Sequence, residues 1–463
     1  MAATSSIALP VVGDQGELRR FRNDVYDCFD RWADALFELF DALSGPVPVS
    51  SLAHLTLAGS AMRGHGSAYA ALADGVIDTG RLRDVLAAAR PRGWRPDFAV
   101  DTSTWARCDA ECSPGRGYYY HPSRQSSGQP IVAGWCYSWL VALSPDADSW
   151  TAPLDAVRLS VTDNANTVAV TQIRALLPRL GELPTAALFA FDGGYDPVQL
   201  TVGLAGTGAQ AVVRVKNDRT FFARPPERGG GWPGRPPRHG TRFACANPET
   251  WHHPDQELIR EHDFFGRVHV QAWHRLHPRQ RTYHDPAGNL AIIDGTLIRV
   301  QVTHLPGRTR EPRTLWLWWT GPDHDCDLDR IWQAYIRRFD IEHTLRLAKQ
   351  TLGWTTPRPR TPEQADRWTC LILAAINQLR LARPLVADHR LPWQPPQPNR
   401  RMTPGRVRQG FGHLLHRIGT PASQPKHARP GPGRPKGRTS TPADRCPALK
   451  KAEVKTPKRR TVP

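Results

Sequence analysis

The segment from 334 to 350, AYIRRFDIEHTLRLAKQ, combines an acid, two bases and a phenol at regular spacing. Tyr335 is followed by Arg338, Glu342 and Lys349 after three, seven and fourteen residues. Because an α-helix turns by about 100° per residue, these four side chains fall within roughly 60° of one another on one helix face. A carboxylate can bind a divalent metal ion, and Arg and Lys beside it can bind phosphate. This face therefore has the residue types needed to cut or join a nucleic-acid backbone.

The same segment is also compatible with a solvated amphipathic helix that carries an i,i+4 ion pair between Arg338 and Glu342. Two upstream acids favour the chemical interpretation. Asp101 closes the apolar run FAVD and Asp192 closes LFAFD, although either alone could be a turn residue that ends a strand. Cleavage of a phosphodiester with two metal ions needs carboxylates that converge from distant parts of a chain, and strand ends hold such acids in place. We predict that Asp101, Asp192 and Glu342 form a catalytic, metal-binding triad.

The order of expected elements favours an α/β fold with a mixed-sheet core. Three apolar strands come first, and helices then alternate with two further strands, which gives the order β-β-β-α-β-α-β. The fourth strand, AALFAFD, is apolar throughout and is expected to be buried on both faces. The expected strands are 98–105, 131–144, 154–161, 186–192 and 209–217, and the expected helices are 165–181 and 196–206.

Composition and periodicity divide the chain into five parts. A helical N-terminal domain that could bind DNA comes first, then the first part of the core, a β-rich insertion, the second part of the core with the signature helix, and a basic Pro/Gly-rich tail that is expected to be mostly disordered. The signature helix is expected to start near Leu328, and a final core helix near Pro362. The five parts span residues 1–95, 96–217, 218–320, 321–390 and 391–463.

The spacing Y-x2-R-x3-E-x6-K resembles the signature of a large group of bacterial insertion-sequence DDE transposases, which are RNase H-like superfamily endonucleases. The resemblance covers roughly residues 15–415 and depends on Asp101, Asp192 and 335–349. It implies an RNase H-like core whose last helix pair is displaced by a β-rich insertion. It also implies metal-dependent DNA strand cleavage and strand transfer in cut-and-paste transposition, by a two-metal-ion polynucleotidyl transferase.

By the same resemblance, the cofactor would be Mg²⁺, with Mn²⁺ as a substitute and two ions expected. Tyr335, Arg338 and Lys349 would bind the DNA backbone near the transposon end, and Lys216 and Arg346 are further candidates for phosphate contacts. The partners would be double-stranded DNA, namely terminal inverted repeats and target DNA, and a second copy of the chain as a homodimer in the DNA complex. Tryptophans 318, 319 and 332 could stack on a flipped base or belong to the core.

The net charge of +18 indicates a polyanionic partner, and it is unevenly distributed. Residues 391–463 hold 17 Lys and Arg against Asp444 and Glu453, a net +15. Within this tail, RPGPGRPKGR resembles an AT-hook, in which Arg434 would enter a narrow A/T minor groove. The alternative is generic attraction of a basic tail to phosphate.

Eight scattered cysteines indicate free thiols in a reducing compartment, and no stretch of 18 residues is apolar enough to indicate a membrane span. The sequence therefore favours a bacterial cytoplasmic protein that associates with the nucleoid when bound to DNA. Two other functions stay open. One is a domesticated or inactive DNA-binding protein that keeps the fold, and the other is a carboxylate-based hydrolase such as a glycosidase. The intact acids disfavour the first, and the positive charge around Glu342 disfavours the second.

Overall fold

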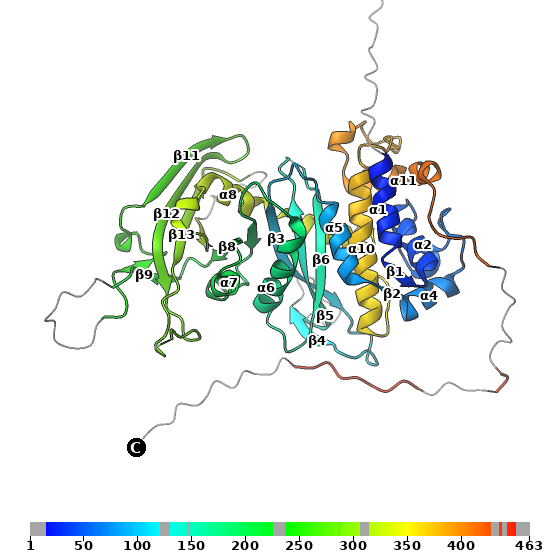
Figure 1. Ribbon diagram of the computed structural model, residues 1–463, viewed down its shortest axis with the longest axis horizontal. Helices are drawn as coiled ribbons and strands as arrows, with labels where there is room; N and C mark the ends of the chain where they lie inside the picture. The colour runs from blue at the N-terminus through cyan, green and yellow to red at the C-terminus, as the bar shows by residue number, and fades with distance from the viewer. Residues whose placement is uncertain are drawn as a thin grey trace, which may run out of the picture.

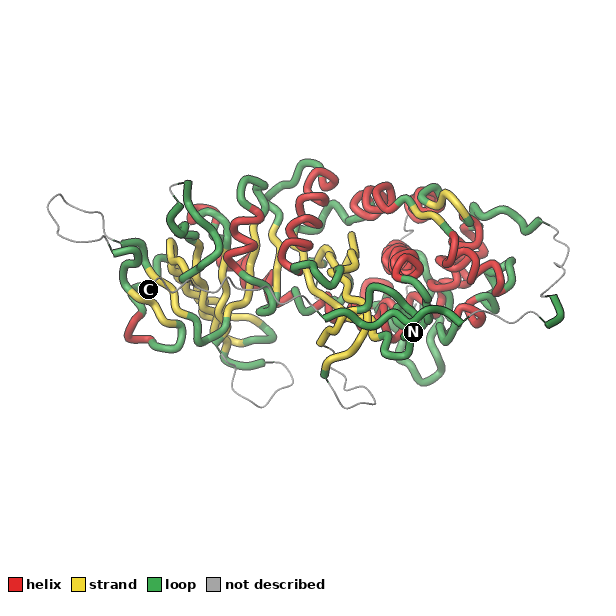
Figure 2. Tube along the Cα trace, turned by 90° about the horizontal axis from the view of Figure 1, so that it is seen from below, coloured by secondary structure: helices red, strands yellow, loops and turns green. Residues whose placement is uncertain are grey.

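The computed structural model describes residues 15–120, 130–146, 148–225, 237–286, 288–305, 314–426, 435–437 and 442–450. The molecule is elongated, with most helices gathered at one end and strands extending toward the other (Figure 1). A view turned by 90° shows the same separation (Figure 2). Among the described residues, no helix is long and apolar enough to cross a membrane.

The centre of the molecule is a mixed sheet in which β3 lies between an antiparallel and a parallel neighbour. The strands lie in the order β6-β5-β3-β7-β8, with β3 antiparallel to β5 and parallel to β7. The order along the chain is the expected β-β-β-α-β-α-β, apart from the short strand β4, and is consistent with an RNase H-like core. The elements are β3 (Asp97–Ala106), β4 (Gly117–Tyr120), β5 (Ile131–Leu143), β6 (Thr151–Leu159), α6 (Ala165–Leu176), η1 (Leu177–Leu180), β7 (Leu188–Phe191), α7 (Pro197–Leu204) and β8 (Gln210–Val215).

The strands expected between 218 and 320 are present, and they continue the central sheet. β14 pairs antiparallel with β8, so the core and the following strands form one sheet of twelve strands. Alternating apolar residues on β12 to β14 bury tryptophans such as Trp316 and Trp318 between this sheet and its covering segments. The elements are β9 (Thr220–Phe222), β10 (Arg242–Ala244), η2 (Pro248–Thr250), β11 (Gln256–His262), β12 (Gly266–Pro278), β13 (Gly295–Val302) and β14 (Leu315–Trp319).

The N-terminal helices pack against the long helix α10 (Pro362–Ala382) and share one hydrophobic core with it and with one face of the sheet. Leu36 and Phe40 lie in this core together with Trp368 and Ile372, all of them fully buried. Helices α6 and α7 cover the opposite face of the central sheet (Figure 1). The N-terminal elements are α1 (Gln15–Tyr26), β1 (Phe29–Arg31), α2 (Ala33–Ser44), α3 (Leu52–Leu55), α4 (His65–Asp74), β2 (Val76–Ile77) and α5 (Thr79–Ala88).

Local sequence signals set several boundaries. The side chain of Thr361 accepts a hydrogen bond from the Gln364 amide and caps α10, with Pro362 in its first turn. Gly353 has φ +63°, a left-handed conformation that suits glycine, and it ends the preceding helical segment. That segment consists of η3 (Asp323–Asp325), α8 (Leu328–Arg337), α9 (Asp340–Arg346) and the π-helical η4 (Leu347–Thr351).

Two parts of residues 391–463, the segment expected to be mostly disordered, have defined contacts in the structure. Helix α11 (Pro404–Ile418), which follows η5 (Asn399–Arg401), buries Val407, Phe411 and Leu414 against α10 and α2. Its apolar residues recur at helical spacing, but the prediction gave more weight to the basic composition of this segment. Farther on, Leu449 pairs in parallel with Gly117 beside the edge strand β4.

Candidate active site

Two of the three predicted acids lie next to each other on neighbouring parallel strands. Val100 pairs with Phe191, Asp101 is the next residue on β3, and Asp192 is the first residue after β7. The Asp192 carboxylate accepts a hydrogen bond of 2.9 Å from the Gly194 amide in the turn after β7. The sequence indicated that Asp101 ends a strand. This is wrong, because β3 continues to Ala106 through its pairing with β5. Asp101 instead marks the point where the pairing with β7 stops.

The third acid, Glu342, lies on a helical segment that is less regular than expected. Helical geometry continues from α8 to α9, but the hydrogen bonding changes at Arg338 and Phe339. Beyond Arg346 the chain adopts a π-helical turn, a distortion often found at functional sites. The four signature residues therefore do not lie along one straight helix. Glu342 is in the first turn of α9.

Arg338 lies between the acid on the sheet and the acid on the helix. Its guanidinium nitrogens lie 3.8 Å from the Asp101 carboxylate and 3.6 Å from the Glu342 carboxylate. The side chain of Arg338 is only 12% exposed, that of Asp101 18%, and that of Glu342 43%. Asp101 is thus the buried end of this arrangement, and Glu342 its solvent-facing end.

The electrostatic consequence is a perturbed acid. Burial and the negative charges of Asp192 and Glu342 together raise the pKa of Asp101 from 3.8 to about 6, although Arg338 and the Thr102 backbone amide oppose this shift. Perturbed carboxyls of this kind cluster at catalytic sites, although structural ion pairs also produce them. The raised pKa means that negative charge at this point is only partly compensated by the surrounding protein.

The other two signature residues lie at the same place. The Tyr335 ring is buried, and the Arg338 guanidinium lies 5.6 Å from its centroid. The Lys349 ammonium lies 5.8 Å from the Trp354 ring, and burial lowers the pKa of Lys349, while Asp101 is among the groups that oppose this shift. Tyr335, Arg338 and Lys349 therefore all border the region between Asp101 and Glu342.

Other candidate residues lie elsewhere. Arg346 is exposed on α9, and Lys216 is exposed just after β8. Arg434 lies outside the described residues. Stacking of a flipped base on the three tryptophans is wrong for this structure, because Trp318, Trp319 and Trp332 are at most 1% exposed and belong to the core.

Arg214 is a neighbour of the site that sequence reasoning missed. Its side chain runs along Gly193, the residue after Asp192, and a Cβ at Gly193 would meet the Arg214 chain at 3.9 Å. Its charge also opposes the raised pKa of Tyr335, which burial causes. The available signal was a single exposed cation within the otherwise apolar strand QAVVRV.

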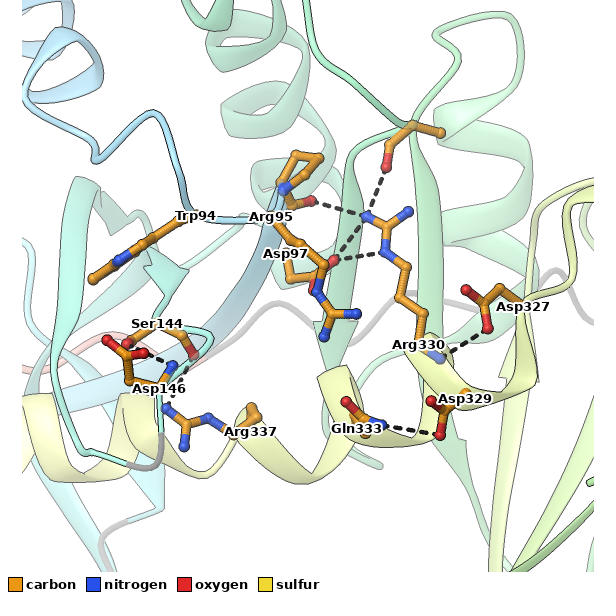
Figure 3. A network of polar contacts seen from close by, with 12 residues as sticks. Trp94, Arg95, Asp97, Ser144, Asp146, Asp327, Asp329, Arg330, Gln333 and Arg337 are labelled. Carbon is orange, nitrogen blue, oxygen red and sulfur yellow. Dashed lines mark hydrogen bonds and ion pairs between the residues drawn. The ribbon is translucent and has the colours of Figure 1, made fainter. Parts of the chain in front are cut away.

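The helix α8 is tied to the sheet by a second ion pair (Figure 3). Arg330 points from α8 toward the sheet and donates to Asp97 at 2.7 and 2.9 Å and to the Ala186 carbonyl at 2.8 Å. Arg337, seven residues later, donates to the carbonyls of Ser144 and Asp148. These contacts fix the helix that leads into Arg338 and Glu342, so Asp97 is a structural acid.

The three carboxylates have the donor atoms that a divalent cation needs, but in this structure they are not close enough together to hold one. Within the described part of the chain, no three His, Cys, Asp or Glu side chains are gathered closely enough to hold a metal ion. Asp101, Asp192 and Glu342 nevertheless supply an all-oxygen donor set, the type that Mg²⁺ and Mn²⁺ prefer. The uncompensated negative charge at Asp101 is what a cation would neutralise.

A groove of about 1020 Å³ runs along α8 and ends at Arg338. Most of its arginines are already paired, for example Arg260 with Asp329 and Arg337 with Asp340. Its walls include the exposed aromatic rings of Phe264 and Phe339. The groove therefore reaches two of the signature residues, Tyr335 and Arg338.

Comparison with known proteins agrees with this geometry. Residues 24–283 match the family model of the DDE superfamily endonucleases, a stretch that includes Asp101 and Asp192 and ends before Glu342. No curated protein matches the chain. Because the match covers more than half of the sequence, the chain belongs to the DDE superfamily endonucleases.

Proposed function

We propose that the protein is a DDE transposase that cleaves DNA strands and transfers them during cut-and-paste transposition of an insertion sequence. One observation carries this proposal. Asp101 and Asp192 follow paired residues of two adjacent strands, and Arg338 lies close to the carboxylates of both Asp101 and Glu342. The family membership supports a nuclease, and the signature residues around Glu342 favour the transposase among nucleases.

Asp101, Asp192 and Glu342 would hold two Mg²⁺ ions, for which Mn²⁺ can substitute. Bound there, the ions would activate the attacking oxygen and stabilise the leaving oxygen of the phosphodiester. The protein's contribution is to fix these acids on two strands and a helix, and to keep Asp101 shielded from bulk water.

The cations of the site would position the DNA backbone. Arg338 can bind a phosphate with two parallel hydrogen bonds, and Lys349, a half-buried cation near Asp101, would add a point charge. Tyr335 supports the Arg338 guanidinium from below. The substrate would be double-stranded DNA that carries terminal inverted repeats, and the active complex would be a homodimer on two DNA ends in the bacterial cytoplasm.

A second candidate is an inactive DNA-binding derivative of the same fold. One observation favours it, namely that the three acids are not gathered closely enough to hold a metal ion within the described residues. In this case, DNA binding would persist and strand cleavage would be absent in any divalent cation.

The test is cleavage of DNA that contains the element and its flanking sequence, by the full chain in Mg²⁺ or Mn²⁺. Asp101→Ala, Asp192→Ala and Glu342→Gln should each abolish cleavage, while circular dichroism and DNA binding stay near the wild-type values. Glu182→Gln, an exposed acid away from the site, is the matched control. A wild-type chain that binds this DNA without cleaving it would favour the inactive derivative. Near-normal cleavage by one of the three variants would remove that residue from the triad.

A further inference from the structure

A second cluster of cations lies away from the signature helix. Lys216, Arg219, Arg242 and Arg279 line an open pocket of about 600 Å³, where Asp218 is the one acid among the lining residues. We call these four residues the end patch. All four are exposed. They come from the segments after β8 and β12 and from the start of β10.

The end patch differs from the groove along α8 in being unpaired. Across the described ranges, none of its four cations forms an ion pair with an acid, whereas the groove's Arg260 and Arg337 both do. The Arg279 guanidinium lies 4.7 Å from the centroid of the Phe222 ring. Exposed cations without partners are free to bind an anion.

Two histidines near the end patch have lowered pKa values, mainly because they are buried, and Arg279 of the patch adds to the shift of His239. Burial lowers the pKa of His277 to about 4, and His239, Arg224 and Arg238 contribute in the same direction. Burial also lowers the pKa of His239, together with Arg279 and Arg238. The imidazoles of His239 and His277 are therefore neutral at pH 7, and the nearby positive charges disfavour their protonation.

The patch shares a sheet edge with the candidate active site. β7 and β8 are parallel, so Asp192 after β7 and Lys216 after β8 leave the sheet at the same edge. From β7, the sheet continues through β8, β14, β13 and β12 to β9, five strand spacings away. At about 4.8 Å per spacing, this path along the sheet is roughly 24 Å long, comparable to about seven base pairs of duplex DNA, and Lys216 lies at its near end, one spacing from β7.

The chemistry of the patch favours the phosphate backbone over bases. Phe222, the aromatic ring of the pocket, is only 8% exposed and lies under Arg279, so it offers no free face for base stacking. Four unpaired cations match the regular negative charge of a duplex. A protein that uses two distant contact sets on one duplex also gains affinity from simultaneous engagement.

We infer that the end patch binds backbone phosphates of the same DNA duplex that enters the site of Asp101, Asp192 and Glu342, several base pairs from the cleaved bond. This inference rests on the proposed function, because it takes DNA as the ligand. It adds a contact surface outside the signature helix, and it gives Lys216 a role there and not at the reacting phosphate.

The first measurement is the salt dependence of binding of the full chain to a labelled 40-base-pair duplex, without divalent ions. The logarithm of affinity should fall with the logarithm of salt concentration, with a slope that loses about 0.9 for each phosphate contact removed. Arg219→Ala/Arg242→Ala should flatten this slope by about two, and adding Lys216→Ala and Arg279→Ala by up to about four. The matched control is Arg92→Ala/Arg174→Ala, two exposed cations outside the patch, which should change the slope little.

The second measurement compares a hairpin whose duplex has five base pairs, about 17 Å long, with the 40-base-pair duplex. Only the longer one can span both contact sets, so the wild-type chain should gain more affinity with length than the patch variants do. Circular dichroism checks that Arg279→Ala keeps its fold. Equal slopes in the patch and control variants, or an unchanged gain with length, would overturn the inference while leaving the proposed function intact. A wild-type chain that binds neither duplex would overturn both.

Discussion

The Arg338 guanidinium lies 3.8 Å from the Asp101 carboxylate and 3.6 Å from the Glu342 carboxylate, so one cation lies between the acid on β3 and the acid on α9. A guanidinium among carboxylates supplies the charge that a metal ion would otherwise supply. The same cation is the best phosphate ligand of the signature helix. Its position therefore links the occupancy of the carboxylates to the binding of DNA.

We predict that Arg338→Gln binds Mn²⁺ several-fold more tightly than the wild type when DNA is absent, because a competing cation has been removed. The measurement is a Mn²⁺ titration followed by electron paramagnetic resonance at pH 8, where Asp101 is ionised. The same variant should flatten the salt slope of DNA binding by about one. Arg346→Gln, an exposed cation on the same segment, is the control. Weaker Mn²⁺ binding in Arg338→Gln would show that Arg338 is needed to position the acids.

Asp101 should reduce the stability of the fold at neutral pH. Its folded pKa, about 6, lies above its ordinary value of 3.8, so the folded protein binds the proton more tightly than the unfolded chain does. The ionised carboxylate therefore costs roughly 3 kcal/mol above pH 6, and this cost disappears as pH falls toward 3.8. Asp101→Asn should raise the free energy of unfolding at pH 8 and by about half as much at pH 5.

Urea denaturation in the presence of a chelator measures this effect, with the exposed-acid variant Asp218→Asn as the control. A gain in stability that accompanies the loss of cleavage is typical of an acid retained for function. No difference between pH 5 and pH 8 would mean that Asp101 is not perturbed in the folded chain.

Arg330 and Asp97 should contribute more to stability than exposed pairs do. Asp97 is 6% exposed, and its carboxylate is held by Arg330 from α8. Arg330→Ala would leave a buried charge without its main partner, so we expect a loss of roughly 3–5 kcal/mol. Arg330→Lys should recover only part of it, because Lys cannot reproduce the forked contact. Arg260→Ala removes the more exposed pair with Asp329 and should cost less than about 1 kcal/mol. Equal losses in Arg330→Ala and Arg260→Ala, measured by thermal and urea unfolding, would contradict this assignment.

Local patterns in the sequence were sufficient to predict the elements that carry the acids. The apolar run before Asp192, the start near Leu328 and the stop at Gly353 all correspond to elements of the structure. The pairing of Asp101 with β5 was not predictable in detail, because the continuation of β3 depends on a partner strand some thirty residues away. Long-range polar contacts such as Arg330 with Asp97 leave no local pattern at all.

The irregular helix shows a second limit of sequence reasoning. An ideal period of 3.6 residues placed Tyr335, Arg338, Glu342 and Lys349 on one face, and the structure does bring them together. It does so through a changed hydrogen-bonding pattern at Arg338 and a π-helical turn beyond Arg346. Such distortions depend on packing against the sheet and on buried charge, which the sequence spacing does not encode.

Two further predictions concern the C-terminal residues, of which 442–450 are anchored to the rest of the protein. Residues 442–450 lie against the edge of the sheet: Leu449 and Cys446 donate backbone hydrogen bonds of 2.7 Å to the carbonyls of Arg116 and Glu111. The buried Arg116 guanidinium in turn donates to the Cys446 carbonyl at 2.6 Å. An unpaired strand edge invites association, and this segment covers part of it.

Removing 442–463 should therefore lower the melting temperature slightly and promote self-association through the uncovered edge of β4. Removing 420–463 takes away twelve Lys and Arg and should also weaken non-specific DNA binding strongly, with the slope against salt flattened by several contacts. Both truncated chains should keep the circular dichroism of the core. Light scattering separates the two effects, because a purely electrostatic tail would change DNA affinity without changing the oligomeric state.

Within the same tail, Arg434→Ala distinguishes an AT-hook from a generic basic segment. A hook reads the narrow A/T minor groove, so the variant should lose preference for A/T-rich over G/C-rich competitor DNA. A generic tail would lose about one phosphate contact equally on both competitors. Lys436→Ala provides the comparison, since it removes one charge two residues away without touching the Gly-Arg-Pro core. Competition binding at two salt concentrations decides the matter: equal losses for both variants on both competitors would end the AT-hook hypothesis, and a loss confined to Arg434→Ala on A/T-rich DNA would support it.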